Sequence, residues 1–225
     1  MSESPAGSPR DCLARGAAAL GLELDGAQLG ALARYIDAVL ECNKGYNLMK
    51  AADAGELAVN HVLDSLAGAP HIARLAASLR KTEAAAVELG DIGSGGGCPG
   101  IPLAIALPDM HVSLVERMER RCVFLEQTVR SLGLSNVSVL CTQADKVPRA
   151  SFDIATFRAF HPFDKKILAM LFAMLKKGGR IVAYKARAEK IAAEMAGVKD
   201  IVPSYTKIAL TVPFLEDHER NLVII

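Results

Sequence analysis

The strongest constraint on the fold is a glycine-rich turn, residues 93–100, between an apolar run ending at Ile92 and a second beginning at Ile101. Glycine lets the backbone approach a ligand without interference from a Cβ atom, and Pro102 is tolerated in the first turn of a helix. The order strand, glycine turn, helix is the first unit of a Rossmann-like nucleotide-binding fold. The glycine cluster alone is a weak signal, since turns and helix caps also contain such clusters.

An acidic residue downstream strengthens this interpretation. Glu116 lies 23 residues after Gly93, at the end of the next predicted strand, where a doubly wound fold places an acid for the ribose hydroxyls. Asp91 precedes the turn, and Gly93, Gly95 and Gly97 have the spacing Gly-x-Gly-x-Gly instead of Gly-x-Gly-x-x-Gly. An acid at this place suits the cationic amine of S-adenosylmethionine and repels a pyrophosphate. The pattern therefore favours S-adenosylmethionine over NAD.

Strand-like and helix-like segments alternate along the rest of the chain. After the first two strands, strands are expected at 137–140, 152–156, 180–185, 208–212 and 221–225, and helices at 101–107, 120–132, 165–175 and 189–195. Such alternation predicts an α/β fold with a mostly parallel sheet, here of seven strands. The last two strands have no helix between them, which indicates an antiparallel hairpin at the sheet edge.

The first third of the chain has the periodicity of helices. Apolar residues recur at helical spacing through 11–43 and 56–66, and Asp25 is placed to cap a helix. We expect a disordered N-terminus at 1–10, a helical region at 11–82 packed on the core, and the methyl-donor domain at 83–225.

Composition bounds the class of protein. The first residues lack the apolar segment of a signal peptide, and no run approaches the length of a membrane helix, so a soluble, cytoplasmic protein is expected. The five cysteines are scattered without a Cys-x-x-Cys pair, which predicts free thiols, no disulfide framework and no metal site. Residues 1–116 carry eight Lys/Arg against fourteen Asp/Glu, and residues 117–225 carry eighteen against eleven. This asymmetry either indicates an acidic partner for one face or reflects solvated helix faces.

A third loop is suited to the adenine ring of the same cofactor. Ala144 and Asp145 follow the strand predicted at 137–140, where a side-chain carboxylate and a backbone N–H can meet the ring edge. From spacing alone, Asp145 is equally well explained as the cap of a turn before Pro148.

Several short motifs together resemble one family. They are Tyr46-Asn47-Leu48, His61-x-x-Asp64-Ser65-Leu66, the run 91–103, Arg121-x-x-Phe124-Leu125, Phe152-Asp153, Arg158-Ala159-Phe160, Gly178-Gly179-Arg180 and Tyr184-Lys185. In this order they resemble the bacterial small-subunit ribosomal RNA 7-methylguanosine methyltransferases, the RsmG (GidB) family, from about Tyr35 to the end. The chain departs from the family pattern at Ser94, Gly96, Cys98, Gln143 and Ala186.

The resemblance implies a class I, Rossmann-like methyltransferase that uses S-adenosylmethionine. Cofactor-binding residues are expected at Asp91, Gly93, Gly95, Gly97, Cys98, Glu116, Ala144, Asp145 and Arg158. Contacts to RNA are expected from His61, Arg121, Lys165 and Lys185. The implied partner is 16S rRNA within the small ribosomal subunit. We expect a monomer with no obligate protein partner.

The residues after the fourth strand bear on the methylated atom. The segment 153–160 lacks the Asn/Asp-Pro-Pro-aromatic motif of exocyclic amine methyltransferases, and these loops lack the cysteine nucleophile of cytosine C5 enzymes. Guanine N7 needs neither device, because its lone pair is free at neutral pH and no proton has to be removed. We therefore assign no catalytic acid or base, and interpret His61 and Asp64 as structural or RNA-positioning residues.

Three other functions remain in competition. A small-molecule or protein methyltransferase predicts a deep lidded pocket and little salt dependence of binding. An NAD-dependent oxidoreductase with a helical cap predicts binding of NAD, against which Asp91 and the glycine spacing argue. A catalytically inactive RNA-binding module predicts a broken cofactor loop, and this loop is intact.

Overall fold

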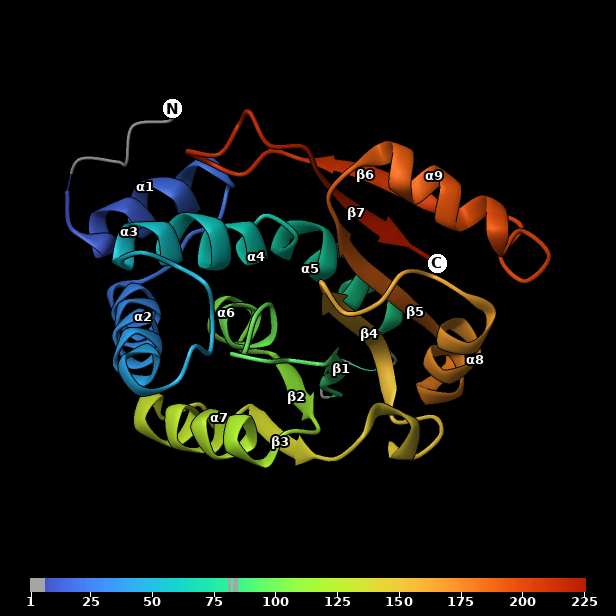
Figure 1. Ribbon diagram of the computed structural model, residues 1–225, viewed down its shortest axis with the longest axis horizontal. Helices are drawn as coiled ribbons and strands as arrows, with labels where there is room; N and C mark the ends of the chain where they lie inside the picture. Colours follow the sequence, from blue (N-terminus) through green and yellow to red (C-terminus); the bar gives the residue numbers. More distant parts are fainter. Residues whose placement is uncertain (1–6, 81, 83–84) are drawn as a thin grey trace.

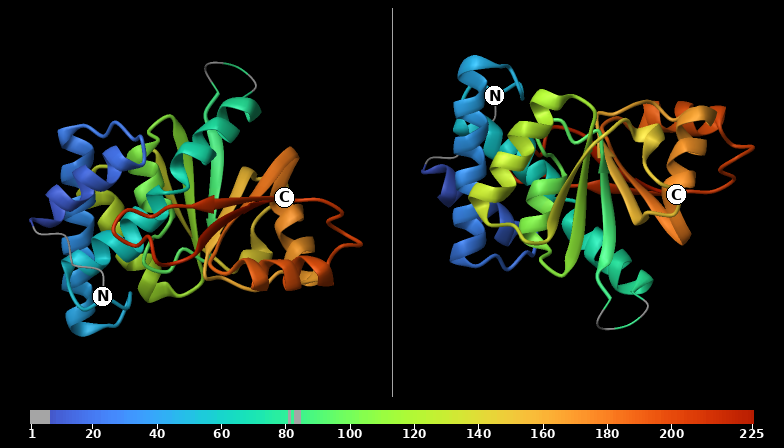
Figure 2. Two further views of the ribbon diagram at one scale, coloured as in Figure 1. Left: turned by 90° about the horizontal axis from the view of Figure 1, so that it is seen from above. Right: turned by 90° about the horizontal axis from the view of Figure 1, so that it is seen from below.

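A seven-stranded sheet separates two groups of helices in the computed structural model, which describes residues 7–80, 82 and 85–225 (Figure 1, Figure 2). The strands are β1 (Val87–Ile92), β2 (Met110–Glu116), β3 (Val137–Cys141), β4 (Phe152–Arg158), β5 (Leu175–Lys185), β6 (Thr206–Leu210) and β7 (Arg220–Ile224). The helices are α1 (Pro9–Ala19), α2 (Gly26–Gly45), α3 (Ala54–Leu57), η1 (Ala58–Leu63), α4 (Asp64–Leu66), α5 (Ala69–Leu79), α6 (Gly100–Ala106), α7 (Glu119–Leu132), the turn η2 (Ala144–Lys146), α8 (Lys165–Met174) and α9 (Ala188–Gly197).

The sheet has the order β3-β2-β1-β4-β5-β7-β6, which confirms the predicted fold class. The strands from β3 to β5 are parallel, whereas β7 runs antiparallel to both β5 and β6. The chain moves outward from β1 in one direction and then returns to form β4 on its other side. The expected antiparallel hairpin is therefore present, with its second strand next to the parallel strands. This order opens a crevice at the carboxyl ends of β1 and β4, where ligands bind in open α/β sheets.

Alternate residues of the strands pack into two separate cores. Val182 and Tyr184 of β5 belong to the cluster that contains α1, α2 and the helices up to α7. Ile181 and Ala183 of the same strand belong to the cluster with α8 and α9. Since side chains in a strand point to alternate faces, both faces of the sheet are buried. The helices of residues 9–79 thus cover part of one face of the sheet (Figure 2).

Capping residues define several helix ends. Asp25 caps α2 and, with Gln28, forms the reciprocal pair of hydrogen bonds known as a capping box. Gly133, with a φ of 70°, ends α7 in the left-handed conformation that glycine adopts without strain. Both features agree with the sequence pattern.

Two sequence-based expectations need correction. The disordered N-terminus expected at 1–10 lies partly outside the described residues, but Ser8 caps α1, and Pro9 and Arg10 belong to that helix. The strand predicted at 180–185 begins earlier, at Leu175 directly after α8, because Leu175 pairs with Phe152 of β4. Along residues 7–80, 82 and 85–225, no helix combines the length and apolar character that crossing a membrane requires.

The expectation of five free cysteines is also wrong. Cys122 and Cys141 form a disulfide, with their Cα atoms 5.7 Å apart. They are 19 residues apart in sequence, but α7 returns antiparallel to β3 in the crossover from β2. This brings the first turn of the helix to the end of the strand. Spacing rules for adjacent cysteines do not detect such a pair.

Candidate functional site

A cavity of about 700 Å³ lies at the carboxyl ends of β1 and β4. The glycine turn forms one side of it and the segment after β4 another, while the N-terminal helices and the start of β7 complete the wall. Its lining includes Leu48, Met49, Asn60, His61, Asp64, Gly93, Ser94, Gly95, Gly96, Cys98, Arg121, Arg158, Phe160, His161, Tyr184, Lys185 and Arg220. The volume falls within the range of small-molecule and cofactor pockets.

The glycine turn gains its shape from backbone conformations that other residues avoid. Gly93, Gly95 and Gly97 have φ angles of 76°, 58° and 98°. A Cβ atom on Gly93 would lie 2.6 Å from the Phe160 ring, and one on Gly97 would lie 2.5 Å from Cδ1 of Ile101. Gly93 and Gly97 are therefore required both by the backbone and by the space around them, whereas Gly95 is required by its backbone conformation.

Asp91 lies beneath the turn and not on the cavity surface. Its side chain is 1% exposed, and its Oδ2 accepts a hydrogen bond of 3.0 Å from Gly100 N–H at the start of α6. Oδ1 is buried without a hydrogen-bond partner among the described residues. Burial raises the pKa of Asp91 to about 7, although the Gly100 N–H bond opposes this rise. An unpartnered buried carboxylate oxygen is a favourable place for a hydrogen-bond donor, in particular a cationic one.

Glu116 holds three backbone groups in place. Its Oε2 accepts from Gly95 N–H at 3.0 Å, and its Oε1 accepts from Arg117 N–H and Met118 N–H at 2.9 Å each. Arg121 Nη1 lies 3.8 Å from Oε2, so the buried carboxylate has a cation nearby. A carboxylate has about four acceptor positions, and these bonds use three of them. The acid at the end of β2 thus links its own turn to the glycine turn.

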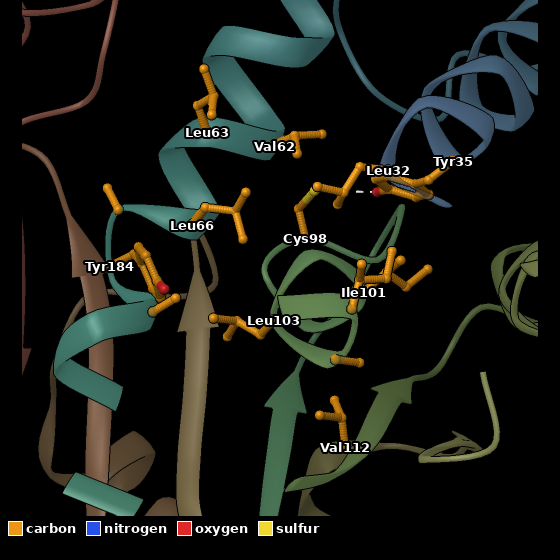
Figure 3. Close-up of a cluster of buried hydrophobic side chains, with 14 of the residues drawn as sticks. Leu32, Tyr35, Val62, Leu63, Leu66, Cys98, Ile101, Leu103, Val112 and Tyr184 are labelled. Atoms are coloured by element: carbon orange, nitrogen blue, oxygen red, sulfur yellow. Dashed lines mark hydrogen bonds between the residues drawn. The ribbon is translucent and has the colours of Figure 1, made fainter. Parts of the chain in front are cut away.

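Tyr35 of α2 supports the glycine turn from the helical region. Its hydroxyl donates to the Gly96 carbonyl at 2.7 Å and lies 3.2 Å from Sγ of Cys98 (Figure 3). Tyr35 is 1% exposed and Cys98 is 7% exposed. Burial raises the pKa of both groups, so they are neutral at neutral pH. The wall at Cys98 is consequently a packed surface without a reactive thiolate.

Two arginines share one buried carboxylate on the opposite side. Asp64 is 4% exposed; its Oδ2 accepts from Arg158 Nη1 at 2.9 Å and its Oδ1 from Arg220 Nε at 2.8 Å. Arg158 Nη1 also donates to the Asn60 carbonyl at 2.9 Å. Asn60 and His61 lie in η1, a π-helical segment, and such segments frequently occur at functional sites. The three charged residues come from the helical region, from β4 and from β7.

His61 is fixed as a neutral imidazole in this network. Its Nδ1 lies 2.8 Å from Arg158 Nη2, and its Nε2 lies 3.1 Å from the Lys50 carbonyl. An arginine only donates, so Nδ1 accepts and the proton is on Nε2. Burial lowers the pKa of His61, and the charge of Arg158 lowers it further. Both nitrogens and both Asp64 oxygens are in use, so these residues form no free acid–base pair.

The remaining sequence-predicted residues lie in different places. Ala144 and Asp145 form η2 directly after β3 and do not line the cavity, and Asp145 is exposed. Arg121 and Lys185 do line it. Lys165 lies outside it and pairs with Asp200 at 2.6 Å, with about 60% of both side chains exposed. The cavity thus unites Gly93, Gly95, Cys98 and Arg158 with His61, Arg121 and Lys185.

The sequence pattern does not predict three residues that shape the site, of which Arg220 and Asn60 line the cavity and Tyr35 supports the glycine turn. Arg220 was overlooked, although a charged residue at the head of an apolar strand is an unusual feature. Tyr35 was seen only as part of an apolar helix face. Asn60 contributes a backbone carbonyl, for which no sequence signal exists.

Comparison with known proteins identifies relatives along nearly the whole chain. The family model described as GidB, rRNA small subunit methyltransferase G, matches residues 28–223. A ribosomal RNA small subunit methyltransferase G of Ralstonia nicotianae is 38% identical over 226 residues, covering 100% of this chain and 98% of the relative. The protein of that name from Treponema denticola is 38% identical over 204 residues, covering 81% of this chain and 80% of the relative.

A solved structure supports the fold. A SAM-dependent methyltransferase from Aquifex aeolicus superposes with a TM-score of 0.52 and 16% identity, covering 76% of this chain and 93% of that one. At this identity the likeness concerns the arrangement of strands and helices alone.

Proposed function

The chain belongs to the rRNA small subunit methyltransferase G family. From that premise we propose that it transfers a methyl group from S-adenosylmethionine to N7 of a guanine in the decoding-region hairpin of 16S rRNA. The observation that carries the proposal is a single cavity in which the glycine turn of a nucleotide-binding fold meets arginine and aromatic side chains. The substrate in this proposal is the rRNA within the small subunit, and the enzyme acts as a monomer.

The residues of the cavity fit the proposed cofactor. Substituents on Gly93 or Gly96 would collide with Phe160 or Met49, so the turn presents bare backbone to a ligand. Beneath the turn and outside the cavity lining, Asp91 Oδ1 has no partner among the described residues and suits the methionyl amine. In the proposal Gly93, Gly95, Gly97, Cys98 and Arg158 surround the methionyl part, Glu116 takes the ribose, and Ala144 and Asp145 take the adenine.

The chemistry requires positioning and exclusion of water more than proton transfer. The cofactor, when bound, supplies an electrophilic methyl group on a sulfonium. Guanine N7 carries an in-plane lone pair, so the protein has no proton to remove. Asp64 and His61 keep Arg158 and Arg220 at the cavity wall, and their hydrogen bonds leave them no role as a general base. The rate enhancement then comes from orientation and desolvation.

The residues proposed to contact RNA differ in their exposure and in the protein groups that they already bind. Arg121 is partly exposed at the cavity, and its Nε is buried without a partner among the described residues. His61 and Lys185 line the cavity but also bind protein groups. Lys165 lies farther out, where an exposed lysine can meet a phosphate of a large substrate.

The test uses methyl-labelled S-adenosylmethionine and small ribosomal subunits from a strain that lacks this gene. We expect label in 7-methylguanosine at one position of the decoding-region hairpin. Glu116→Ala is expected to weaken cofactor binding, and Glu119→Ala, in the exposed first turn of α7, is the matched control. If the protein binds the cofactor but labels no RNA, the substrate is a small molecule or a protein. If it binds NAD and not S-adenosylmethionine, the cofactor proposal is wrong.

A further inference from the structure

The segment that follows β4 places two aromatic rings at the cavity. We propose that Phe160 and His161 form the surface on which the target guanine stacks, and that Lys185 holds this surface as a positioning residue. The proposal rests on the proposed function and adds to it the residues that receive the base. It also gives Lys185 a role other than a direct RNA contact.

The location of the two rings is set by an unusual backbone turn. Ala159 has a φ of 52°, a left-handed conformation that costs a residue with a Cβ atom free energy. The turn carries the chain away from β4, so that Phe160 and His161 both line the cavity. Phe160 lies directly against Gly93, the first glycine of the cofactor turn. Backbone strain of this kind is concentrated at functional sites.

The rings are accessible to a ligand. Phe160 is half-buried and His161 is exposed, although most aromatic side chains nearby belong to the core. Their ring centroids are 4.7 Å apart with an interplanar angle of 80°, so one ring presents its face where the other presents its edge. Phe157 lies behind them, with its centroid 5.8 Å from that of Phe160. Phe160 and His161 thus form an aromatic corner, which packs on the buried ring of Phe157.

Lys185 and Glu194 hold this corner together. Lys185 Nζ donates to Glu194 Oε2 at 2.7 Å and to the His161 carbonyl at 3.2 Å, while Glu194 Oε2 accepts from Phe163 N–H at 2.9 Å. The Lys185 ammonium also lies 4.4 Å from the centroid of the Phe163 ring. The side chains of Lys185 and Glu194 are only 13% and 19% exposed, so water screens the pair weakly. A lysine in these contacts defines the path of residues 161–163.

A guanine needs a surface of this kind to reach the site. The cavity is a recess at the sheet edge, so a base within a helix has to leave its stack to place N7 inside. A base that has left its stack is stabilised by aromatic rings, which contact its π face whatever its hydrogen bonds. Among the residues that line the cavity, Phe160 and His161 are adjacent aromatic rings at least partly open to solvent.

The test compares Phe160→Leu, Phe160→Ala and Phe160→Trp. Initial methylation rates are measured on undermethylated small subunits, and the dissociation constant for S-adenosylmethionine is measured by calorimetry. We expect kcat/KM to fall about tenfold in Phe160→Leu and about a hundredfold in Phe160→Ala, while Phe160→Trp retains activity and cofactor affinity stays constant. Phe172→Leu, which alters an exposed phenylalanine of α8 outside the cavity, is the matched control and is expected to leave the rate unchanged.

The outcomes separate this proposal from the one on which it rests. If the wild-type protein does not label guanine, the proposed function fails. If the wild type labels guanine and Phe160→Leu methylates it at the same rate, the stacking surface is refuted while the proposed function stands. If the cofactor dissociation constant rises by the same factor as kcat/KM falls, the ring serves the cofactor and the inference is wrong.

The positioning role of Lys185 is tested by one substitution that removes its charge and by a second that restores it. Lys185→Met is expected to lower kcat about tenfold with unchanged cofactor affinity, because the aromatic corner loses the hydrogen bonds that Lys185 donates to the His161 carbonyl and Glu194. Lys185→Arg restores a donor to Glu194 and the His161 carbonyl, and is expected to recover most of the rate. A direct contact with an RNA phosphate would instead raise KM in Lys185→Met and make the dependence of KM on salt concentration shallower than in the wild type. That result would overturn the positioning role.

Discussion

The two sides of the cavity are built in opposite ways. The glycine wall, residues 93–98 with Glu116, is made largely of backbone, and its hydrogen bond to the Glu116 carboxylate spans only 21 residues of sequence. The ionic wall, made of Asn60, His61, Asp64, Arg158 and Arg220, depends on side chains from segments up to 156 residues apart. The glycine wall tolerates changes in side-chain chemistry but not in volume. The ionic wall tolerates changes in volume but not in charge, because the loss of one charged group leaves its partners buried and unpaired.

The largest expected effect is the loss of Asp64. Asp64→Ala leaves Arg158 and Arg220 without their shared carboxylate, and breaking a buried pair costs about 3–5 kcal/mol. Urea unfolding of the variant measures this loss. Asp200→Ala, which removes the exposed partner of Lys165, is the control and is expected to leave the unfolding midpoint unchanged. Equal stability of the two variants would show that the ionic wall is not held by charge.

A smaller effect is expected from the pH dependence of Asp91. Burial raises its pKa to about 7, so the folded state binds a proton that the unfolded chain has already released. The stabilisation is therefore complete at low pH and is lost as pH rises toward 7, by about 1.4 kcal/mol per pH unit.

Asp91→Asn removes this dependence. Relative to the wild type, the variant is expected to gain roughly 2 kcal/mol of stability between pH 5 and pH 8, as measured by urea titrations at both values. A constant difference between the two proteins at both pH values would contradict a raised pKa. Cofactor affinity at pH 8 is expected to fall in the variant, since the methionyl amine loses its anionic partner.

The third effect concerns volume in the glycine wall. Gly97 and Gly133 both have a positive φ, but a Cβ atom on Gly97 meets Ile101 and one on Gly133 meets nothing within 4 Å. Gly133→Ala is expected to cost about 1–2 kcal/mol from the backbone alone. Gly97→Ala is expected to cost more and to weaken S-adenosylmethionine binding at least tenfold, whereas Gly133→Ala leaves binding intact. Unchanged binding in Gly97→Ala would mean that the shape of the turn does not control affinity.

The smallest effect tests the Tyr35 hydroxyl, which joins the helical region to the glycine wall at the Gly96 carbonyl and at Cys98 Sγ. Tyr35→Phe leaves the Gly96 carbonyl without its donor and is expected to cost about 1 kcal/mol of stability. Cofactor affinity falls only a few-fold, because the turn keeps its other contacts. Tyr205→Phe, at an exposed tyrosine, is the control. A full loss of cofactor binding in Tyr35→Phe would show that the conformation of the glycine turn depends on its bond to α2.

The difference between the walls explains what the sequence reveals. Gly93, Glu116 and the alternation of strands follow local rules, so the fold and the glycine wall are predictable. The pairing of Asp64 with Arg220 joins two ends of the chain, and no local pattern encodes it. The same holds for Cys122 and Cys141, which only the crossover brings together. Asp91 remains a predicted cofactor residue, and its place beneath the turn, where it accepts from Gly100 N–H, follows from no local pattern.

The position of β7 between β5 and β6 has a consequence for damaged copies of the protein. A chain cut by a protease or by an early stop codon before residue 220 retains the glycine turn, Glu116 and every family motif up to Lys185. It nevertheless lacks Arg220 and the strand that joins β6 to the rest of the sheet. Such a fragment would pass a search for motifs and still be unable to assemble the cavity. In genome surveys, therefore, a truncation in the last strand should be counted as a loss of the gene product.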